Sequence, residues 1–159
     1  LFYKLFNDLV VLHNLGFSHK DIKPSNILLS KDGNNYIPIL GDIGLMDNLN
    51  YLSPVGTKLF MPPEFQDFAL INSKKDLYKH DVWALSLTSL LTINYLSNMI
   101  NNNEIINLTK HIKKVDIQNY IPDQHKNFCN AIKYGLLHSS SKRFSAKKIS
   151  IMLEKILDK

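Results

Sequence analysis

The sequence predicts one mainly α-helical domain, in which about six or seven helices surround a buried central helix and a small β-hairpin accompanies them. Apolar residues recur at spacings of three and four near both ends of the chain, which is typical of amphipathic helices. Residues 82–93 are apolar on almost every side, as expected of a helix that is buried all round. Two short apolar runs on either side of a polar turn indicate the hairpin.

The first predicted helix covers residues 1–15, and Gly16 directly after it suits a helix C-cap. The hairpin follows, with strands predicted at residues 27–29 and 36–40 on either side of the turn-forming residues 30–35. If these strands pair as a hairpin, the residue before the first strand and the residue after the second lie at the same end of the ribbon.

The second half of the chain is predicted to be helical, after a loop at residues 45–60 that shows no regular spacing. The central helix should begin at Asp81, because residues 76–80 are polar. The other helices are expected at residues 64–69 (short), at residues 104–115, at residues 128–137 with Asp123 as N-cap, and from the N-cap Ser145 onward.

The composition limits the class of protein. The chain has 159 residues, of which 45% are hydrophobic and 21% charged, as in ordinary globular domains. Its formal net charge of +5 is spread along the chain, which favours a solvated surface over a nucleic-acid partner. The single Cys129 excludes an internal disulfide and fits the protein core. No apolar stretch is long enough to span a bilayer, so we expect an intracellular, cytoplasmic protein.

Residues 19–26, which read His-Lys-Asp-Ile-Lys-Pro-Ser-Asn, concentrate groups that phosphoryl transfer requires. Asp21 could accept a proton from a hydroxyl, Lys23 could place a positive charge beside a phosphate, and Asn26 could offer an amide oxygen to Mg²⁺. Asp42 adds a carboxylate beside a flexible glycine. The hairpin brings Asn26 and Asp42 to one end, which predicts a shared cation site. Each residue alone could also be an ordinary turn, capping or surface residue.

Five motifs, in this order, resemble the C-terminal lobe of a eukaryotic-type serine/threonine protein kinase, and the resemblance covers essentially all of residues 1–159. They are His19-Lys20-Asp21 with Lys23 and Asn26 in register, Asp42-Ile43-Gly44, Gly56-Thr57 through Pro62-Pro63-Glu64, Asp81-Val82-Trp83-Ala84-Leu85, and Arg143. These resemble, respectively, the family's His-Arg-Asp loop, its Asp-Phe-Gly motif, the substrate-docking segment that ends in Ala-Pro-Glu, the start of the large buried helix, and an Arg near the last helix.

The resemblance implies a catalytic role for four residues, Asp21, Lys23, Asn26 and Thr57, with ATP as phosphoryl donor and a protein as substrate. Asp21 would be the general base or would orient the acceptor hydroxyl. Lys23 would contact the γ-phosphate, and a lysine at this position resembles the serine/threonine class. Thr57 would bridge Asp21 and Lys23.

The resemblance also implies binding and structural roles. Asn26 and Asp42 would hold Mg²⁺, while Ser25 and Leu28 would lie at the nucleotide, with Leu28 beneath the adenine ring. The structural residues would be the buried ion pair Glu64–Arg143, Asp81 as acceptor for backbone N–H groups of the catalytic loop, and His19 as a buried scaffold residue.

The sequence departs from the family pattern in ways that affect activity. Lys20 stands where the family has Arg and lacks the bidentate fork that grips a phosphorylated activation loop. Ile43 replaces a Phe, and Pro62 replaces an Ala. The 159 residues contain no Gly-rich loop, no strand lysine for the α- and β-phosphates and no glutamate-bearing helix to pair with it. We therefore expect the N-terminal lobe to be absent from this chain and the chain alone to be inactive.

Two alternatives remain open. The chain could be a kinase-derived binding or scaffold module, which the absent N-terminal lobe favours but the presence of Asp21, Asn26 and Asp42 argues against. It could also be a small-molecule kinase of the aminoglycoside phosphotransferase type, which has a similar His-x-Asp loop. Lys23 and Arg143 argue against that second alternative.

Overall fold

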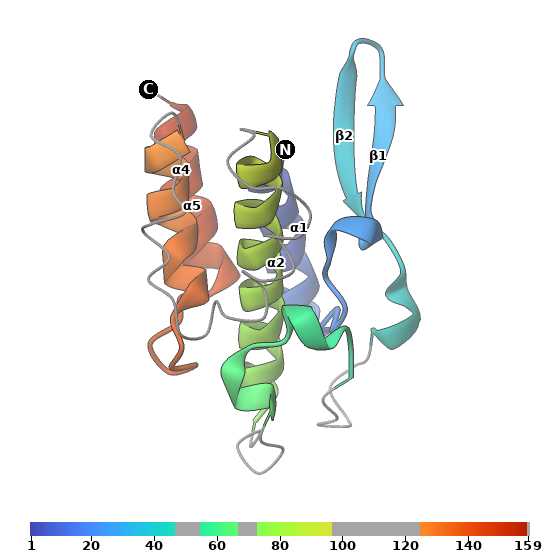
Figure 1. Cartoon of the computed structure of the whole chain (residues 1–159). Helices are drawn as coiled ribbons and strands as arrows, with labels where there is room; N and C mark the ends of the chain where they lie inside the picture. The colour runs from blue at the N-terminus through green and yellow to red at the C-terminus, as the bar shows by residue number, and fades with distance from the viewer. Residues whose placement is uncertain (47–54, 67–72, 97–124, 159) are drawn as a thin grey trace.

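The computed structural model describes residues 1–46, 55–66, 73–96 and 125–158. In these residues, helices stand together in a bundle and one two-stranded antiparallel sheet projects beside them (Figure 1). The α-helices and strands are α1 (Phe2–Asn14), β1 (Ile27–Asp32), β2 (Asn35–Leu40), α2 (Lys74–Leu96), α4 (Lys126–Ile132) and α5 (Ala146–Leu157). The prediction of a mainly α-helical fold with one small hairpin is confirmed. None of the described helices is long and apolar enough to cross a membrane.

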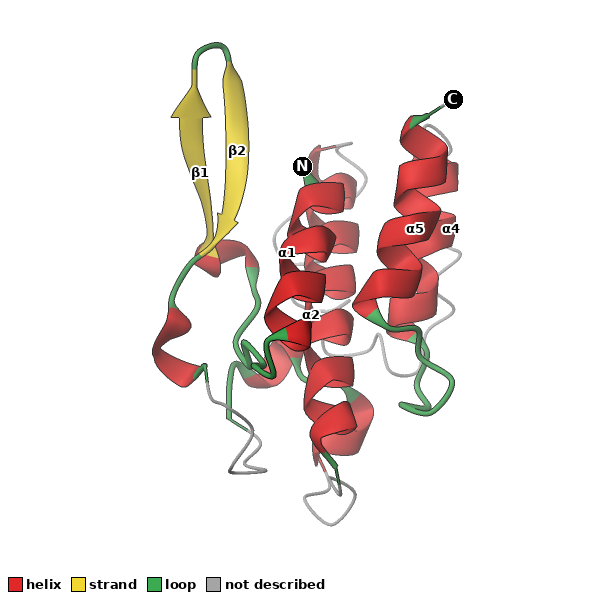
Figure 2. Cartoon of the chain, turned by 180° about the vertical axis from the view of Figure 1, so that it is seen from behind, coloured by secondary structure: helices red, strands yellow, loops and turns green. Residues whose placement is uncertain are grey.

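Helix α2 is the central pillar that the sequence predicted. It stands beside α1, with α4 and α5 on the side away from the hairpin (Figures 1 and 2). Every side chain of residues 81–91 is buried. The helix begins at Lys74 and not at Asp81, so the predicted start was wrong. The polar stretch before Asp81 hides the buried Leu77, and Asp76 caps the helix start by accepting hydrogen bonds from the Ser73 backbone N–H and hydroxyl.

The hairpin is longer than predicted. Its register runs from Ile27 paired with Leu40 to Asp32 paired with Asn35, so the polar residues 30–32 belong to the strand and not to the turn. Only residues 33–34 form the turn, where Gly33 has a φ of +59°. The predicted convergence at the other end is confirmed, because the Gly41 N–H donates to the carbonyl oxygen of Asn26 at 2.8 Å.

The remaining elements follow the prediction in part. The expected helix at 128–137 is α4 followed by a 3₁₀ turn at Lys133–Leu136, where Gly135 lies so close to Ser86 that a Cβ atom would clash with it. Ser145 caps α5 as predicted. Shorter 3₁₀ turns lie at Pro24–Asn26, Ile43–Leu45, Lys58–Phe60 and Pro63–Gln66. The expected helix at 104–115, the cap Asp123 and the second half of the helix at 64–69 lie outside the described residues.

The core forms where α1, α2, α4 and α5 meet. Helix α1 contributes Leu5, Phe6 and Leu9, and α5 contributes Ile149 and Leu153, all buried. Cys129 is also buried in this core, as predicted, and burial raises the pKa of its thiol to about 11.

The predicted ion pair between Glu64 and Arg143 is confirmed. The Nη1 and Nη2 atoms of Arg143 donate to Oε1 and Oε2 of Glu64 at 2.6 and 3.0 Å, a bidentate arrangement. Arg143 is buried, lies over the ring of Trp83, and also donates to the Leu137 and Lys79 carbonyl oxygens. One guanidinium group therefore joins the segment before α2, α2 itself and the loop before α5.

We expect Glu64→Met and Arg143→Met each to lower the free energy of unfolding by about 3–5 kcal/mol, because each leaves a buried charge without its partner. The double variant should lose clearly less than the sum of the two, as measured by urea denaturation. The exposed pair Lys4–Asp8, with Nζ and Oδ2 2.6 Å apart one turn along α1, serves as a control. Its coupling should be about 0.3–0.5 kcal/mol. Additive effects at Glu64 and Arg143 would contradict this account.

Candidate active site

The loop after α1 is held by one buried carboxylate of α2. Asp81 accepts hydrogen bonds from the backbone N–H groups of His19 at 2.9 Å and Lys20 at 2.8 Å, and from the Ser18 hydroxyl at 2.8 Å. The Nε2 atom of His13 lies 3.0 Å from the same carboxylate. Burial alone would raise the pKa of Asp81, but the hydrogen bonds and positive charge of His13 and His80 hold it far below its usual value. The predicted role of Asp81 as acceptor for the loop backbone is confirmed.

The segment that carries Thr57 docks on this loop through a glycine. Gly56 has a φ of +122°, and a Cβ atom there would lie 2.2 Å from the carbonyl oxygen of Lys20. Lys20 itself has a φ of +69°, a left-handed conformation that is rare for residues other than glycine. No side chain fits at Gly56, and this close approach brings Thr57 to Asp21.

Four of the predicted site residues form one hydrogen-bonded cluster around the Asp21 carboxylate. Thr57 donates to Oδ1 from its backbone N–H at 2.8 Å and from its hydroxyl at 2.7 Å. Lys23 Nζ lies 2.7 Å and Asn26 Nδ2 3.1 Å from Oδ2. Lys23 Nζ also donates to the Thr57 hydroxyl at 2.8 Å. We call these four residues the Asp21 cluster.

The cluster sets the charge of Asp21. Its side chain is only 7% exposed, and burial would raise the pKa of the carboxyl group. The hydrogen bonds from Lys23 and Thr57 and the positive charge of Lys23 outweigh burial, so the pKa of Asp21 lies below its usual value. Asp21 is therefore ionised at neutral pH. The four donor contacts on the carboxylate match the number that a carboxylate usually accepts.

The two residues predicted to hold a cation lie at one end of the hairpin. The amide nitrogen of Asn26 donates to the backbone oxygen of Asp21 at 2.8 Å. The amide oxygen of Asn26 therefore points away from that backbone oxygen. Asp42 follows Gly41, whose carbonyl oxygen lies 3.0 Å from Nε2 of the buried His19, the scaffold residue that was predicted. Asp42 is exposed and has a φ of +54°. Amide and carboxylate oxygens suit Mg²⁺.

No group of three His, Cys, Asp or Glu side chains that could hold a metal ion occurs among the described residues. A Mg²⁺ ion at Asn26 and Asp42 would therefore need oxygen ligands from water and from phosphate groups, which is how this ion is usually held at phosphate sites.

The structure places the two remaining predicted residues outside the Asp21 cluster. Ser25 is exposed in the 3₁₀ turn and makes none of the hydrogen bonds of the cluster. Leu28 lies on β1 against Gly41 and is 56% exposed, and Ile43 beyond the hairpin is 62% exposed. Exposed apolar side chains therefore lie next to the end of the hairpin that carries Asn26 and Asp42.

Sequence reasoning missed two residues of the site. His13, in the last turn of α1, bonds to Asp81, which lies 68 positions away along the chain. Gly41 fixes both Asn26 and His19 through its backbone. Nothing in the local spacing indicated His13, whereas the position of Gly41 next to Asp42 was a usable signal for a close backbone approach.

Comparison with known proteins gives the family. The protein kinase domain family matches residues 1–155. The chain is 30% identical over 156 residues to serine/threonine-protein kinase stk11 of Xenopus laevis, covering 93% of this chain and 34% of that protein. It is 34% identical over 89 residues to 3-phosphoinositide-dependent protein kinase 1 of Arabidopsis thaliana, covering 48% and 17%. It is 38% identical over 80 residues to U-box domain-containing protein 52 of the same plant, covering 43% and 9%.

The chain thus spans from 9% to about a third of the length of these curated relatives. The family match nevertheless extends over nearly all of its own length and includes every motif described above. This chain belongs to the protein kinase domain family.

Proposed function

We propose that this chain supplies the catalytic C-terminal lobe of a serine/threonine protein kinase, which transfers the γ-phosphoryl group of ATP to a hydroxyl of a protein substrate. The observation that carries the proposal is the Asp21 cluster, in which an ionised carboxylate contacts a lysine, a threonine and an asparagine at 2.7–3.1 Å. Family membership supports the reaction, and catalysis then rests on positioning and charge neutralisation.

We propose different tasks for the two oxygens of Asp21. Thr57 donates twice to Oδ1, so this oxygen is fixed to the docking segment. Lys23 donates to Oδ2 and can turn away, because its side chain is partly exposed. In the proposed reaction Lys23 moves to the transferring phosphate and Oδ2 takes the proton of the acceptor hydroxyl, whose oxygen bonds to the γ-phosphorus while the bond to the leaving ADP breaks.

The nucleotide cofactor and Mg²⁺ are part of the proposal. Asn26 and Asp42 would hold Mg²⁺, which neutralises charge on the phosphates of ATP when it is bound. Leu28 would support the adenine ring, and Ser25 would lie at the edge of the nucleotide site. Leu28 is exposed, so its side chain is accessible to an adenine ring.

The proposed acceptor class rests on Lys23 and Thr57. The two side chains bond to each other at 2.8 Å, and both bond to Asp21. A lysine and a threonine in these positions resemble the serine/threonine class, and three of the relatives that the chain matches carry serine/threonine kinase in their names.

A second candidate function is a docking module without catalysis. The exposed apolar residues Leu28 and Ile43 favour it, because an uncovered apolar surface promotes association with another protein. The intact Asp21 cluster favours catalysis instead, since a pure docking module has no need of an ionised carboxylate in this setting.

In the longest chain that the gene encodes, we expect Asp21→Asn to lower kcat by about 10²–10⁴-fold, which is the usual size of a general-base contribution. ATP affinity should hardly change, because Asp21 faces the acceptor. The matched variant Asp42→Ala should instead weaken Mg²⁺-dependent ATP binding, which titration calorimetry measures. A near-normal kcat of Asp21→Asn would show that Asp21 is not the general base.

Phosphorylation of a generic protein substrate should occur on serine and threonine. Phosphoamino-acid analysis of the labelled product measures this, with Asp21→Asn as the control for contaminating kinases. A product dominated by phosphotyrosine would contradict the roles proposed for Lys23 and Thr57.

Residues 1–159 alone should bind ATP about two orders of magnitude more weakly than a complete kinase domain. With Leu28 on one side of the adenine and water on the other, about 100 Å² of apolar contact is lost, which at about 25 cal/mol per Å² is about 2.5 kcal/mol. Calorimetry and a peptide phosphorylation assay test this. Robust turnover that disappears in Asp21→Asn would show that these residues need no second lobe, or recruit one from another chain.

A further inference from the structure

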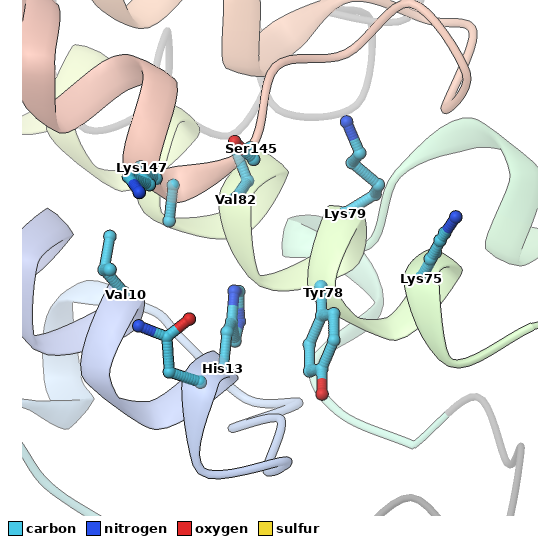
Figure 3. Close-up of a pocket in the computed structure, with 10 residues that line it drawn as sticks. Val10, His13, Lys75, Tyr78, Lys79, Val82, Ser145 and Lys147 are labelled. Atoms are coloured by element: carbon cyan, nitrogen blue, oxygen red, sulfur yellow. The ribbon is translucent and has the colours of Figure 1, made fainter.

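A cavity lies away from the Asp21 cluster. It has a volume of about 380 Å³ and opens between the C-terminal half of α1, the first turns of α2 and the start of α5 (Figure 3). The described residues that line it are Val10, His13, Asn14, Lys75, Tyr78, Lys79, Val82, Ser145, Ala146 and Lys147. None of them belongs to the Asp21 cluster. We call this cavity the α1–α2–α5 pocket.

The polar part of the pocket is positively charged. Figure 3 shows Lys147 on one side and Lys75 and Lys79 on the other, and none of the ten residues that line the pocket is acidic. Lys79 Nζ donates to the carbonyl oxygen of Arg143, and burial, Arg143 and Lys148 together lower the pKa of Lys79, because positive charges that lie close together repel one another. An anionic group in the pocket would relieve that repulsion.

The rest of the wall is apolar or aromatic. Val10, Val82 and Ala146 contribute aliphatic surface. The rings of His13 and Tyr78 lie side by side with their centres 4.4 Å apart, and Figure 3 shows them between the two groups of lysines. A cavity of this volume falls in the range of small-molecule sites and is too small for a folded partner.

One lining residue reaches the catalytic loop. Nε2 of His13 lies 3.0 Å from Oδ2 of Asp81, and the same carboxylate accepts the backbone N–H groups of His19 and Lys20. A ligand that contacts His13 is therefore two hydrogen bonds away from the loop that carries Asp21.

We propose that the α1–α2–α5 pocket binds a small molecule that joins a carboxylate or phosphate group to an apolar body, and that binding acts on the catalytic loop through His13 and Asp81. Lys75 and Lys147 recognise the anionic group, and the neighbouring rings of His13 and Tyr78 with the aliphatic wall receive the apolar body. This site does not depend on catalysis, so its test is independent of the proposed kinase activity.

Binding is tested by calorimetry on residues 1–159 with three probes: 2-naphthyl phosphate, 2-naphthoate and the neutral 2-naphthol. The two anions should bind at least about tenfold more tightly than 2-naphthol, because each gains a charge-assisted contact with lysine. The probe with the higher affinity identifies phosphate or carboxylate as the preferred group. No binding of either anion at millimolar concentration would overturn the proposal.

The site of binding is tested by matched charge reversals. Lys147→Glu should weaken binding of the anionic probe by at least about tenfold, whereas Lys126→Glu should leave it unchanged. Both lysines are exposed in the first turn of a helix, where a glutamate is tolerated, so both variants should fold. Lys75→Glu, also at a helix start, replaces Lys147→Glu if circular dichroism shows that variant unfolded. Equal affinities in the pocket variant and Lys126→Glu would place the probe elsewhere, for example at the nucleotide site.

The effect on the catalytic loop is tested by nuclear magnetic resonance. Saturation with the anionic probe should shift the backbone amide signals of His19 and Lys20, and the His13→Ala variant should lose that shift. The amide signal of Ser30 on β1 serves as the control and should not move. If His19 and Lys20 are unaffected while the probe occupies the pocket, the proposed connection to the loop is wrong.

Discussion

The site depends on the hydrogen bonds that the carboxylate of Asp81 accepts from the loop after α1. A buried charge is strongly unfavourable unless it is paired and hydrogen-bonded, and Asp81 is fully buried in the central helix. Its bonds come from the end of α1 and from the loop that follows, where the backbone N–H groups of His19 and Lys20 point to it. Satisfying this one group therefore fixes the path of the loop that carries Asp21, including the left-handed conformation of Lys20.

A second set of constraints places the segment that carries Thr57. Arg143 binds Glu64 in a bidentate pair and also bonds to backbone oxygens on α2 and in the loop before α5. Upstream of Glu64, Gly56 approaches the Lys20 carbonyl so closely that no side chain fits. The segment is thus held at both ends, by an ion pair and by a backbone contact. The position of Thr57 beside Asp21 is the result of these contacts between residues far apart in the sequence.

The sequence predicted what local periodicity controls and missed what tertiary contacts decide. The helices at both ends, the hairpin and the buried helix all follow from apolar spacing. The start of α2 was wrong because Leu77 is a single buried residue in a polar stretch, although Ser73 and Asp76 carried a capping signal. The contact between Asp21 and Thr57, 36 positions apart, was accessible only through resemblance to a family. The bond from His13 to Asp81 had no signal in the sequence at all.

The hydrogen bonds of the Asp21 cluster have two opposite effects on the proposed role of Asp21 as a base. The bonds that keep Asp21 ionised also lower its pKa, and a carboxylate of lower pKa is a weaker base. Lys23 contributes both a hydrogen bond and a charge to that shift. If, as proposed, Lys23 turns to the transferring phosphate, both contributions decrease, so the pKa of Asp21 rises, and Oδ2 keeps only its contact with Asn26 and can accept the proton of the acceptor hydroxyl. Thr57 stays on Oδ1 and preserves the orientation. In the proposed mechanism the phosphate draws Lys23 away from Oδ2 and so makes Asp21 a stronger base, while the hydrogen bonds from Thr57 to Oδ1 are kept.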